Sequence, residues 1–315
     1  SKGLRHGYII NGPDVTQSIV AAVKLAEKTS GVKVHKAFVA VGGIGLSGLT
    51  STGSLIVGSA DSQITDLDIE KLNEICEENL PTSVIQNHRI LHSIPLSYKI
   101  DGKMVLAKSP LDMKGTKLEV KMLFVTSLES HLNDLLEAVD EAGIEVIDVL
   151  ASPIAASFVT LSKTQKIAGA VLANIGAETV SIVVFENNIP ISLEVFPIGS
   201  TDITNDIALG LKIPLEEAEN IKVRGLGGNS FSKKKLEDII SARLADIFEL
   251  IENHLKKIGR NGLLPAGIFI TGGGASLGVA VEDFAKITLK LPSRITTMNL
   301  GGEKNYIKDS TWAVA

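Results

Sequence analysis

Apolar positions recur at helical spacing in several stretches of the chain, and this pattern predicts a series of amphipathic helices. Pro13 and Asp14 begin the first helix, and Gly31 ends it. Another begins at Thr65, because Asp68 three residues later completes a pattern that resembles a capping box. Further helices are predicted after a cap at Ser152, over residues 128–143, 201–211, 215–223 and 233–258, and from a triple glycine to about residue 289.

Shorter apolar runs bounded by glycine, proline and Asp-Gly predict strands. The glycine-rich residues 42–58 predict strands joined by tight turns. Because paired strands come first and strands then alternate with helices, the pattern indicates an α/β fold. The other predicted strands cover residues 34–41, 84–105, 118–126, 144–150, 190–196 and 268–271, with two more between 169 and 185.

Composition narrows the class of protein. The 315 residues carry a net charge of −5, which argues against a nucleic-acid partner, since such proteins present a basic surface. The single cysteine, Cys76, excludes a disulfide framework and fits a reducing compartment. Residues 37–60 and 261–281 are uncharged but rich in glycine, so they predict buried strands rather than membrane spans. No secretory signal is evident, and we expect both ends of the chain to be trimmed.

A turn between two apolar strands is the first candidate for phosphate binding. It comprises Asn174, Gly176, Ala177, Glu178 and Thr179. Backbone N–H groups at such a turn can bind phosphate oxygens, small residues allow close approach, and the threonine adds a hydroxyl donor. Taken alone, the segment is more typical of an ordinary hairpin.

A second glycine turn lies about a hundred residues further on. Gly272, Gly273, Gly274 and Ser276 follow a strand and precede a helix, so a flat base or a phosphate could lie against their backbone. The segment matches neither dinucleotide nor P-loop patterns. The alternative is a turn whose glycines serve only close strand-to-helix packing.

Two further groups could complete a nucleotide site. Glu219 and Lys222 share a helix face and could hold a ribose hydroxyl and a base or phosphate. Taken alone, the pair is more typical of a solvated ion pair. Gly199 and Ser200 precede a helix whose N-terminus could face an anion. The histidines show no metal-binding spacing. His88 and His92 fall in a strand and are interpreted as structural, and no Ser/His/Asp arrangement is evident.

The long helix that begins with three lysines is a candidate partner site, since cations are disfavoured at a helix N-terminus. Lys235 and Arg243 are about 12 Å apart on nearly one face, and Ile239 lies between them. This pattern suits a short acidic and apolar peptide. The alternative is that Arg243 pairs internally with Asp246 or Glu249.

Several segments in this order resemble the FtsA family of bacterial cell-division proteins, within the actin-like ATP-binding superfamily. The turn at 174–179, the Glu219/Lys222 helix and the triple glycine resemble the superfamily's second phosphate loop, nucleoside-contacting helix and adenosine loop. The segments that resemble FtsA itself are SKGLRHG at 1–7, RILHSIP at 89–95, PLDMKG at 110–115, NDIA at 205–208, AENIK at 218–222 and Ala242-Arg243.

The resemblance implies a two-lobed actin-like (ribonuclease-H-like) fold with an FtsA-type inserted subdomain. The implied division is lobe 1 at 1–35 and 126–166, the inserted subdomain at 36–125, the lobe 2 core at 167–205, a partner-binding subdomain at 206–264, and the lobe 2 core with a return to lobe 1 at 265–315.

The resemblance also implies function. FtsA proteins bind ATP with Mg²⁺, form filaments, and tether the C-terminal tail of FtsZ to the inner face of the cell membrane at the division site, in the cytoplasm. Their membrane tether is a C-terminal amphipathic helix, expected beyond residue 315, and the first phosphate loop is expected before Ser1. Asn174 stands where actin-like ATPases carry Asp, so ATP hydrolysis is expected to be weak or absent, because an amide cannot act as a general base.

The alternatives are a PilM-like adaptor of type IV pilus assembly, a small-molecule kinase of the same superfamily and a nucleotide-free scaffold. The kinase would need a catalytic Asp beside the phosphate loops, which the sequence lacks.

Overall fold

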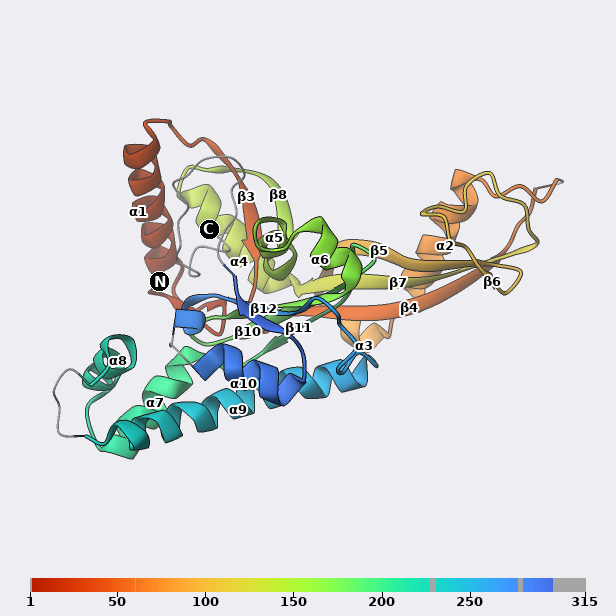
Figure 1. Cartoon of the computed structure of the whole chain (residues 1–315). Helices are drawn as coiled ribbons and strands as arrows, with labels where there is room; N and C mark the ends of the chain where they lie inside the picture. The colour runs from red at the N-terminus through yellow and green to blue at the C-terminus, as the bar shows by residue number, and fades with distance from the viewer. Residues whose placement is uncertain (1, 60, 227–230, 277–279, 297–315) are drawn as a thin grey trace.

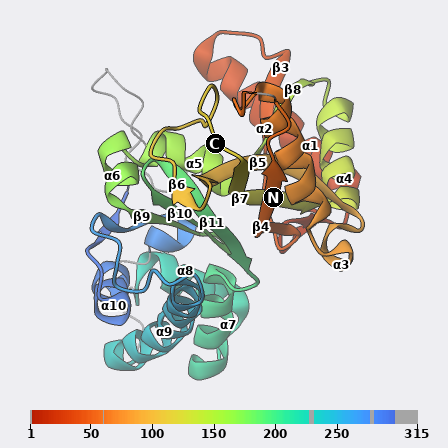
Figure 2. The same ribbon diagram turned by 90° about the vertical axis from the view of Figure 1, so that its right-hand side faces the viewer.

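The protein has two lobes and a long projecting subdomain (Figure 1). In this computed structural model, residues 2–59, 61–226, 231–276 and 280–296 are described. Figure 2 separates the helices α1 (Gly12–Ser30) and α4 (Glu129–Glu141) of lobe 1 from the helical layer of lobe 2. Within the described residues, no helix is long and apolar enough to cross a membrane.

Lobe 1 is built on two parallel strands, β3 (Lys36–Val41) and β8 (Glu145–Ala151), against which α1 and α4 pack. The predicted end of α1 at Gly31 is confirmed, since this residue adopts a φ of 73°. The helix begins at Gly12, just before the predicted Pro13, and the Asn11 side chain caps it by accepting a hydrogen bond from Asp14 N. The remaining elements of this lobe are β1 (Leu4–Arg5), β2 (Tyr8–Ile9) and α5 (Ser152–Thr160).

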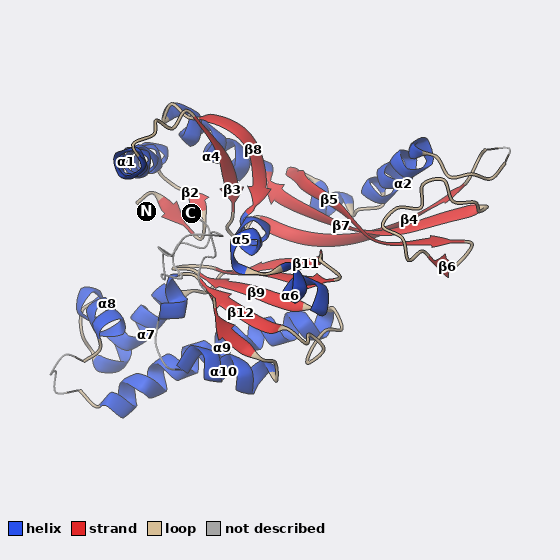
Figure 3. Ribbon diagram, turned by 45° about the horizontal axis from the view of Figure 1, so that its top comes forward, coloured by secondary structure: helices blue, strands red, loops and turns tan. Residues whose placement is uncertain are grey.

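The inserted subdomain is a four-stranded antiparallel sheet in the order β4-β7-β5-β6, and its long strands are evident in Figure 3. Helix α2 packs on one face through Leu72 and Cys76. The predicted capping box is present, since Thr65 and Asp68 exchange hydrogen bonds. The bounds are β4 (Leu46–Ile56), β5 (His88–Ile100), β6 (Lys103–Met104), β7 (Lys117–Leu128), α2 (Asp66–Glu78) and α3 (Thr82–Ile85).

Lobe 2 is a mixed five-stranded sheet in the order β11-β10-β9-β12-β13, with helices α7 to α10 packed on one face. Its strands are β9 (Ala170–Ile175), β10 (Val180–Glu186), β11 (Ile189–Phe196), β12 (Gly267–Thr271) and β13 (Ser293–Ile295). Its helices are α6 (Lys163–Ala168), α7 (Ser200–Leu211), α8 (Leu215–Arg224), α9 (Lys233–Lys257) and α10 (Ala280–Leu289), with a 3₁₀ turn at Gly273–Ser276.

One hydrophobic core joins all three parts. The second face of the lobe 2 sheet packs against α5 and against the base of the inserted sheet. Leu46, Leu123 and Val125 from that base lie in the same cluster as Leu172 and Leu193 of lobe 2. Gly48 passes so close to β11 that an added Cβ would lie 2.8 Å from Leu193 O. The inserted subdomain is therefore anchored on lobe 2 as well as on lobe 1.

Several expected boundaries need correction. Strand pairing places residues 36–41 in lobe 1, because β3 pairs with β8, so the inserted subdomain begins after β3 and not at residue 36. The boundary at residue 205 falls inside α7. Residues 42–58 contain one eleven-residue strand rather than several short ones. Ser152 is the first residue of α5, and Ala151 takes the cap position. The expected return to lobe 1 near the C-terminus lies largely outside the described residues.

Candidate functional site

The first predicted phosphate-binding segment is the turn of the β9–β10 hairpin. Its turn is closed by a hydrogen bond of 2.9 Å from Gly176 N to Thr179 O. Ala177 is exposed at the tip, and Glu178 and Thr179 are half-buried. The segment is therefore a hairpin, as one interpretation of the sequence held. Because its tip is exposed, the other interpretation, a phosphate-binding turn, also remains.

The N-terminus of α7 packs directly behind this hairpin. Ser200 N donates to Gly176 O at 2.9 Å, and Thr201 N donates to Ala177 O at 2.7 Å. Gly199 N donates to Asp202 Oδ2 at 2.8 Å. These N–H groups hold protein oxygens. Gly199 and Ser200 therefore position the hairpin, whereas the sequence suggested that this helix end would face an anion itself.

The second glycine turn packs against the base of the same hairpin. A Cβ added to Gly272 would lie 2.5 Å from Ile175 O, and one added to Gly274 would lie 3.0 Å from Ile175 Cβ. These two glycines therefore serve close packing, which is the alternative that the sequence left open. Gly273 differs, because it is exposed between its buried neighbours.

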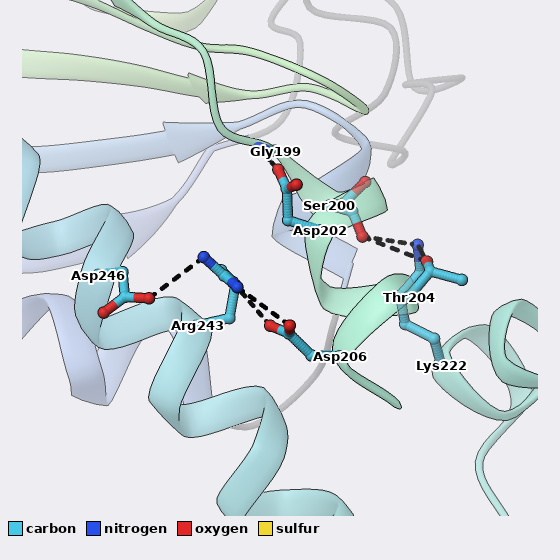
Figure 4. A network of polar contacts seen from close by, with 8 residues as sticks. All are labelled: Gly199, Ser200, Asp202, Thr204, Asp206, Lys222, Arg243 and Asp246. Atoms are coloured by element: carbon cyan, nitrogen blue, oxygen red, sulfur yellow. Dashed lines mark hydrogen bonds and ion pairs between the residues drawn. The ribbon is translucent and has the colours of Figure 1, made fainter. Parts of the chain in front are cut away.

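Lys222 turns inward to the N-terminal turn of α7. Its ammonium donates to Ser200 O at 3.1 Å and to Thr204 Oγ1 at 2.7 Å (Figure 4). It also pairs with Glu219 at 2.6 Å. Only 6% of the Lys222 side chain is exposed, against 50% for Glu219. Partial burial would raise the pKa of Glu219, but hydrogen bonds from Lys222 and Thr204 outweigh it and hold that pKa below its usual value.

The predicted segments thus come together around one hairpin. The glycine turn packs on its base, the start of α7 supports its tip, and Lys222 bonds to the start of α7. Exposed Gly273 and the hairpin tip supply the small, backbone-lined surface that a nucleotide requires. The position at 174 holds an amide instead of a carboxylate, and no group of three potential metal ligands occurs among the described residues.

The predicted partner residues on α9 differ from one another in their surroundings. Lys235 is exposed, but Ile239 is half-buried against α7, where its Cδ1 would meet a Cβ added to Gly210. Arg243 donates to both oxygens of Asp206 at 2.7 and 3.0 Å and pairs with Asp246 at 3.3 Å (Figure 4). Hydrogen bonding to Asp206 raises the pKa of Arg243. The sequence suggested Asp246 as an internal partner but missed Asp206.

Two clusters of polar contacts were not predicted from the sequence. Ser192 Oγ lies 2.7 Å from His254 Nε2, and His254 Nδ1 lies 3.5 Å from Glu194 Oε2, so this histidine ties α9 to β11. The second cluster links the lobes. His6 N donates to Glu178 Oε2 at 2.6 Å, and His6 Nδ1 lies 3.1 Å from Glu178 O. Both join residues far apart in sequence, which no local pattern specifies.

Comparison with known proteins agrees with this architecture. A family model described as "Cell division protein FtsA" matches residues 171–315, and a model of the SHS2 domain inserted in FtsA matches residues 43–126. The Cell division protein FtsA of Bacillus subtilis is 31% identical over 97% of this chain and 73% of its own length. That of Pseudomonas aeruginosa is 29% identical over 94% of this chain and 74% of its own length.

Solved structures support the fold. A chain of the PilM–PilN type IV pilus biogenesis complex superposes with a TM-score of 0.65 at 18% identity, over 92% of this chain and 76% of that one. The ethanolamine utilization protein EutJ from Carboxydothermus hydrogenoformans gives a TM-score of 0.53 at 15% identity, over 94% of this chain and 73% of that one.

Proposed function

Because the chain belongs to the FtsA family of cell-division proteins, we propose that it binds ATP at the β9–β10 hairpin, forms filaments and links FtsZ to the membrane at the division site. The observation that carries the proposal is the convergence of the hairpin tip, Gly273 and the start of α7. The PilM-like alternative has less support, since the likeness to PilM lies in the fold, at 18% identity.

Nucleotide binding would use the hairpin tip for the phosphates and Gly273 for the base or ribose. Lys222 would act indirectly, because its ammonium holds the start of α7, which in turn supports the hairpin. Glu219 is half-exposed and could still meet a ribose hydroxyl. A magnesium ion would come with the nucleotide and neutralise phosphate charge. Since Asn174 cannot accept a proton from water, hydrolysis would be weak or absent.

Calorimetric titration with ATP tests this site. Gly273→Val should abolish measurable affinity, because its side chain would occupy the backbone surface offered to the base. Gly58→Val is the matched control, since Gly58 is exposed and an added Cβ would meet no atom within 4 Å. Normal ATP affinity in Gly273→Val, or none in the unmodified protein, would refute the site.

The FtsZ tail would bind on α9, with Lys235 as its exposed cation and Ile239 and Arg243 beside it. Since Arg243 already holds two carboxylates, an acidic tail would either join that cluster or displace Asp206. The C-terminal amphipathic helix of the family would hold these filaments at the cytoplasmic face of the membrane.

Fluorescence anisotropy with a labelled FtsZ tail peptide tests the α9 surface. Lys235→Glu should weaken binding about tenfold, because it replaces an attractive charge with a repulsive one. Lys28→Glu on α1 makes the same charge change at an exposed position of lobe 1 and should leave affinity unchanged. Equal affinity for both variants would remove Lys235 from the site.

A further inference from the structure

Glu178 carries a negative charge at the hairpin that we propose for phosphate binding. The residue lies in the turn between β9 and β10, next to exposed Ala177, and its side chain is half-buried. A carboxylate at this position repels an incoming phosphate, since like charges at close range in a partly desolvated site disfavour each other. The position therefore needs an explanation other than direct phosphate binding.

The carboxylate is held by the opposite lobe. Glu178 Oε2 accepts a hydrogen bond of 2.6 Å from His6 N, in the turn between β1 and β2. The Glu178 carbonyl lies 3.1 Å from His6 Nδ1, and because a carbonyl can only accept, the ring nitrogen must carry the proton. Two hydrogen bonds, one of them charge-assisted, thus join the phosphate hairpin to lobe 1.

The His6 turn is itself fixed to the start of the inserted subdomain. His6 O accepts a hydrogen bond of 3.2 Å from Ile44 N. Gly7 and Gly43 are in such close contact that a Cβ added to Gly43 would lie 3.0 Å from Gly7 Cα. The partner of Glu178 is therefore a well-packed turn and not a loose terminus.

We propose that Glu178 is a built-in anion that latches the two lobes through His6 and competes with nucleotide phosphate for the hairpin. The proposal rests on the proposed nucleotide site. With the latch closed, the carboxylate occupies the side of the hairpin that faces lobe 1. A bound nucleotide would bring several negative charges to the same tip and favour release of Glu178 from His6. Nucleotide binding and lobe contact would then be coupled through one residue.

The test compares the full chain with Glu178→Gln, which keeps the shape of the side chain and removes its charge. In calorimetric titration with metal-free ATP, Glu178→Gln should bind about tenfold tighter, which corresponds to about 1.4 kcal/mol. With excess Mg²⁺ the difference should shrink, because the metal neutralises phosphate charge. Glu216→Gln removes an exposed carboxylate at the start of α8 and should leave affinity unchanged. A merely structural contact would give weaker or equal binding in Glu178→Gln.

The latch itself is measured without nucleotide. Hydrogen exchange at the His6 amide should be about tenfold faster in Glu178→Gln than in the unmodified chain. Unchanged exchange would overturn the latch, and equal or weaker ATP affinity would overturn the competition. Loss of Mg²⁺-dependent binding would overturn it too, by identifying Glu178 as a metal ligand. If no variant binds ATP, the proposed nucleotide function and the competition both fail, while exchange still decides the latch.

Discussion

Gly199 lies between β11 and α7, where the chain has no room for a side chain. Its backbone is extended, so the requirement is steric and not conformational. A Cβ there would lie 2.5 Å from Ala177 C and 2.7 Å from Glu178 N. The residue thus fixes the distance between the hairpin and the helix that supports it.

Gly199→Ala should lower the free energy of unfolding by about 1–3 kcal/mol, because the backbone of the hairpin must move to accommodate the methyl group. Urea denaturation followed by circular dichroism measures the change. Gly58→Ala, at an open and exposed position, should change stability by far less. Equal stability of the two variants would show that the backbone of the hairpin accommodates the methyl group without loss of stability.

At the scale of elements, His92 joins β5 to the end of β8. Its Nε2 accepts a hydrogen bond of 3.0 Å from Ala151 N, so this nitrogen must be unprotonated. Burial lowers the pKa of His92 below its usual value of 6.5, and the nearby Asp148 only partly opposes that effect. The interpretation of His92 as a structural residue is consistent with this contact.

The lowered pKa predicts a specific acid sensitivity. Below about pH 6.5 the unfolded chain takes up a proton at His92 more readily than the folded chain does. The free energy of unfolding should therefore decrease as the pH is lowered. Between pH 7 and pH 5, His92→Gln should lose less stability than the unmodified protein. His88→Gln, on the same strand, should keep the original pH dependence. Parallel pH profiles for the unmodified chain and His92→Gln would contradict this assignment.

Local signals predicted the elements well. Gly31 and the Thr65–Asp68 pair act within one helical turn, so the sequence alone indicates their role. The glycine run after β12 was harder to interpret, since Gly272 and Gly274 pack on Ile175 whereas Gly273 is exposed. In a run of identical residues, the sequence does not indicate which residue faces the core.

Long-range pairs could not be predicted, because either partner has several plausible neighbours. Arg243 illustrates this: Asp246 is three residues away, so the sequence predicts it as a partner, whereas Asp206 comes from another helix and forms the shorter bonds. The sequence therefore indicates which segments form the site. It does not indicate which of their side chains are held by ion pairs or hydrogen bonds within the protein.

At the scale of the whole molecule, we propose that the inserted subdomain forms the contact between neighbouring molecules of a filament. Its base belongs to the central core. Deleting residues 36–125 would remove β3 from lobe 1 and Leu123 from that core, so loss of filaments would then be uninformative. Ile100 and Leu118 lie opposite each other at the distal end of the β5–β7 register. An Asn-Gly turn joining them removes β6 and the distal loop, and it keeps β5 and the base of the sheet.

This shortened variant should stay folded but form no filaments under conditions in which the full chain forms them. Electron microscopy detects the filaments, and circular dichroism with thermal unfolding checks the fold. The same Asn-Gly turn inserted at exposed Gly58 of the full chain is a control that should still assemble. Filaments of unchanged spacing from the shortened variant would exclude the distal end of the subdomain as a contact.

The shared core also makes the inserted subdomain a lever. Leu46, Leu123 and Val125 are clamped between the lobes, so the projecting sheet turns with its base. The eleven residues of β4 span about 36 Å at about 3.3 Å per residue. A tilt of about 5° at the base would displace the far end by about 3 Å, which is about the length of a hydrogen bond. A small adjustment between the lobes would thus be amplified into a change of fit at the tip, where a neighbouring molecule could detect it.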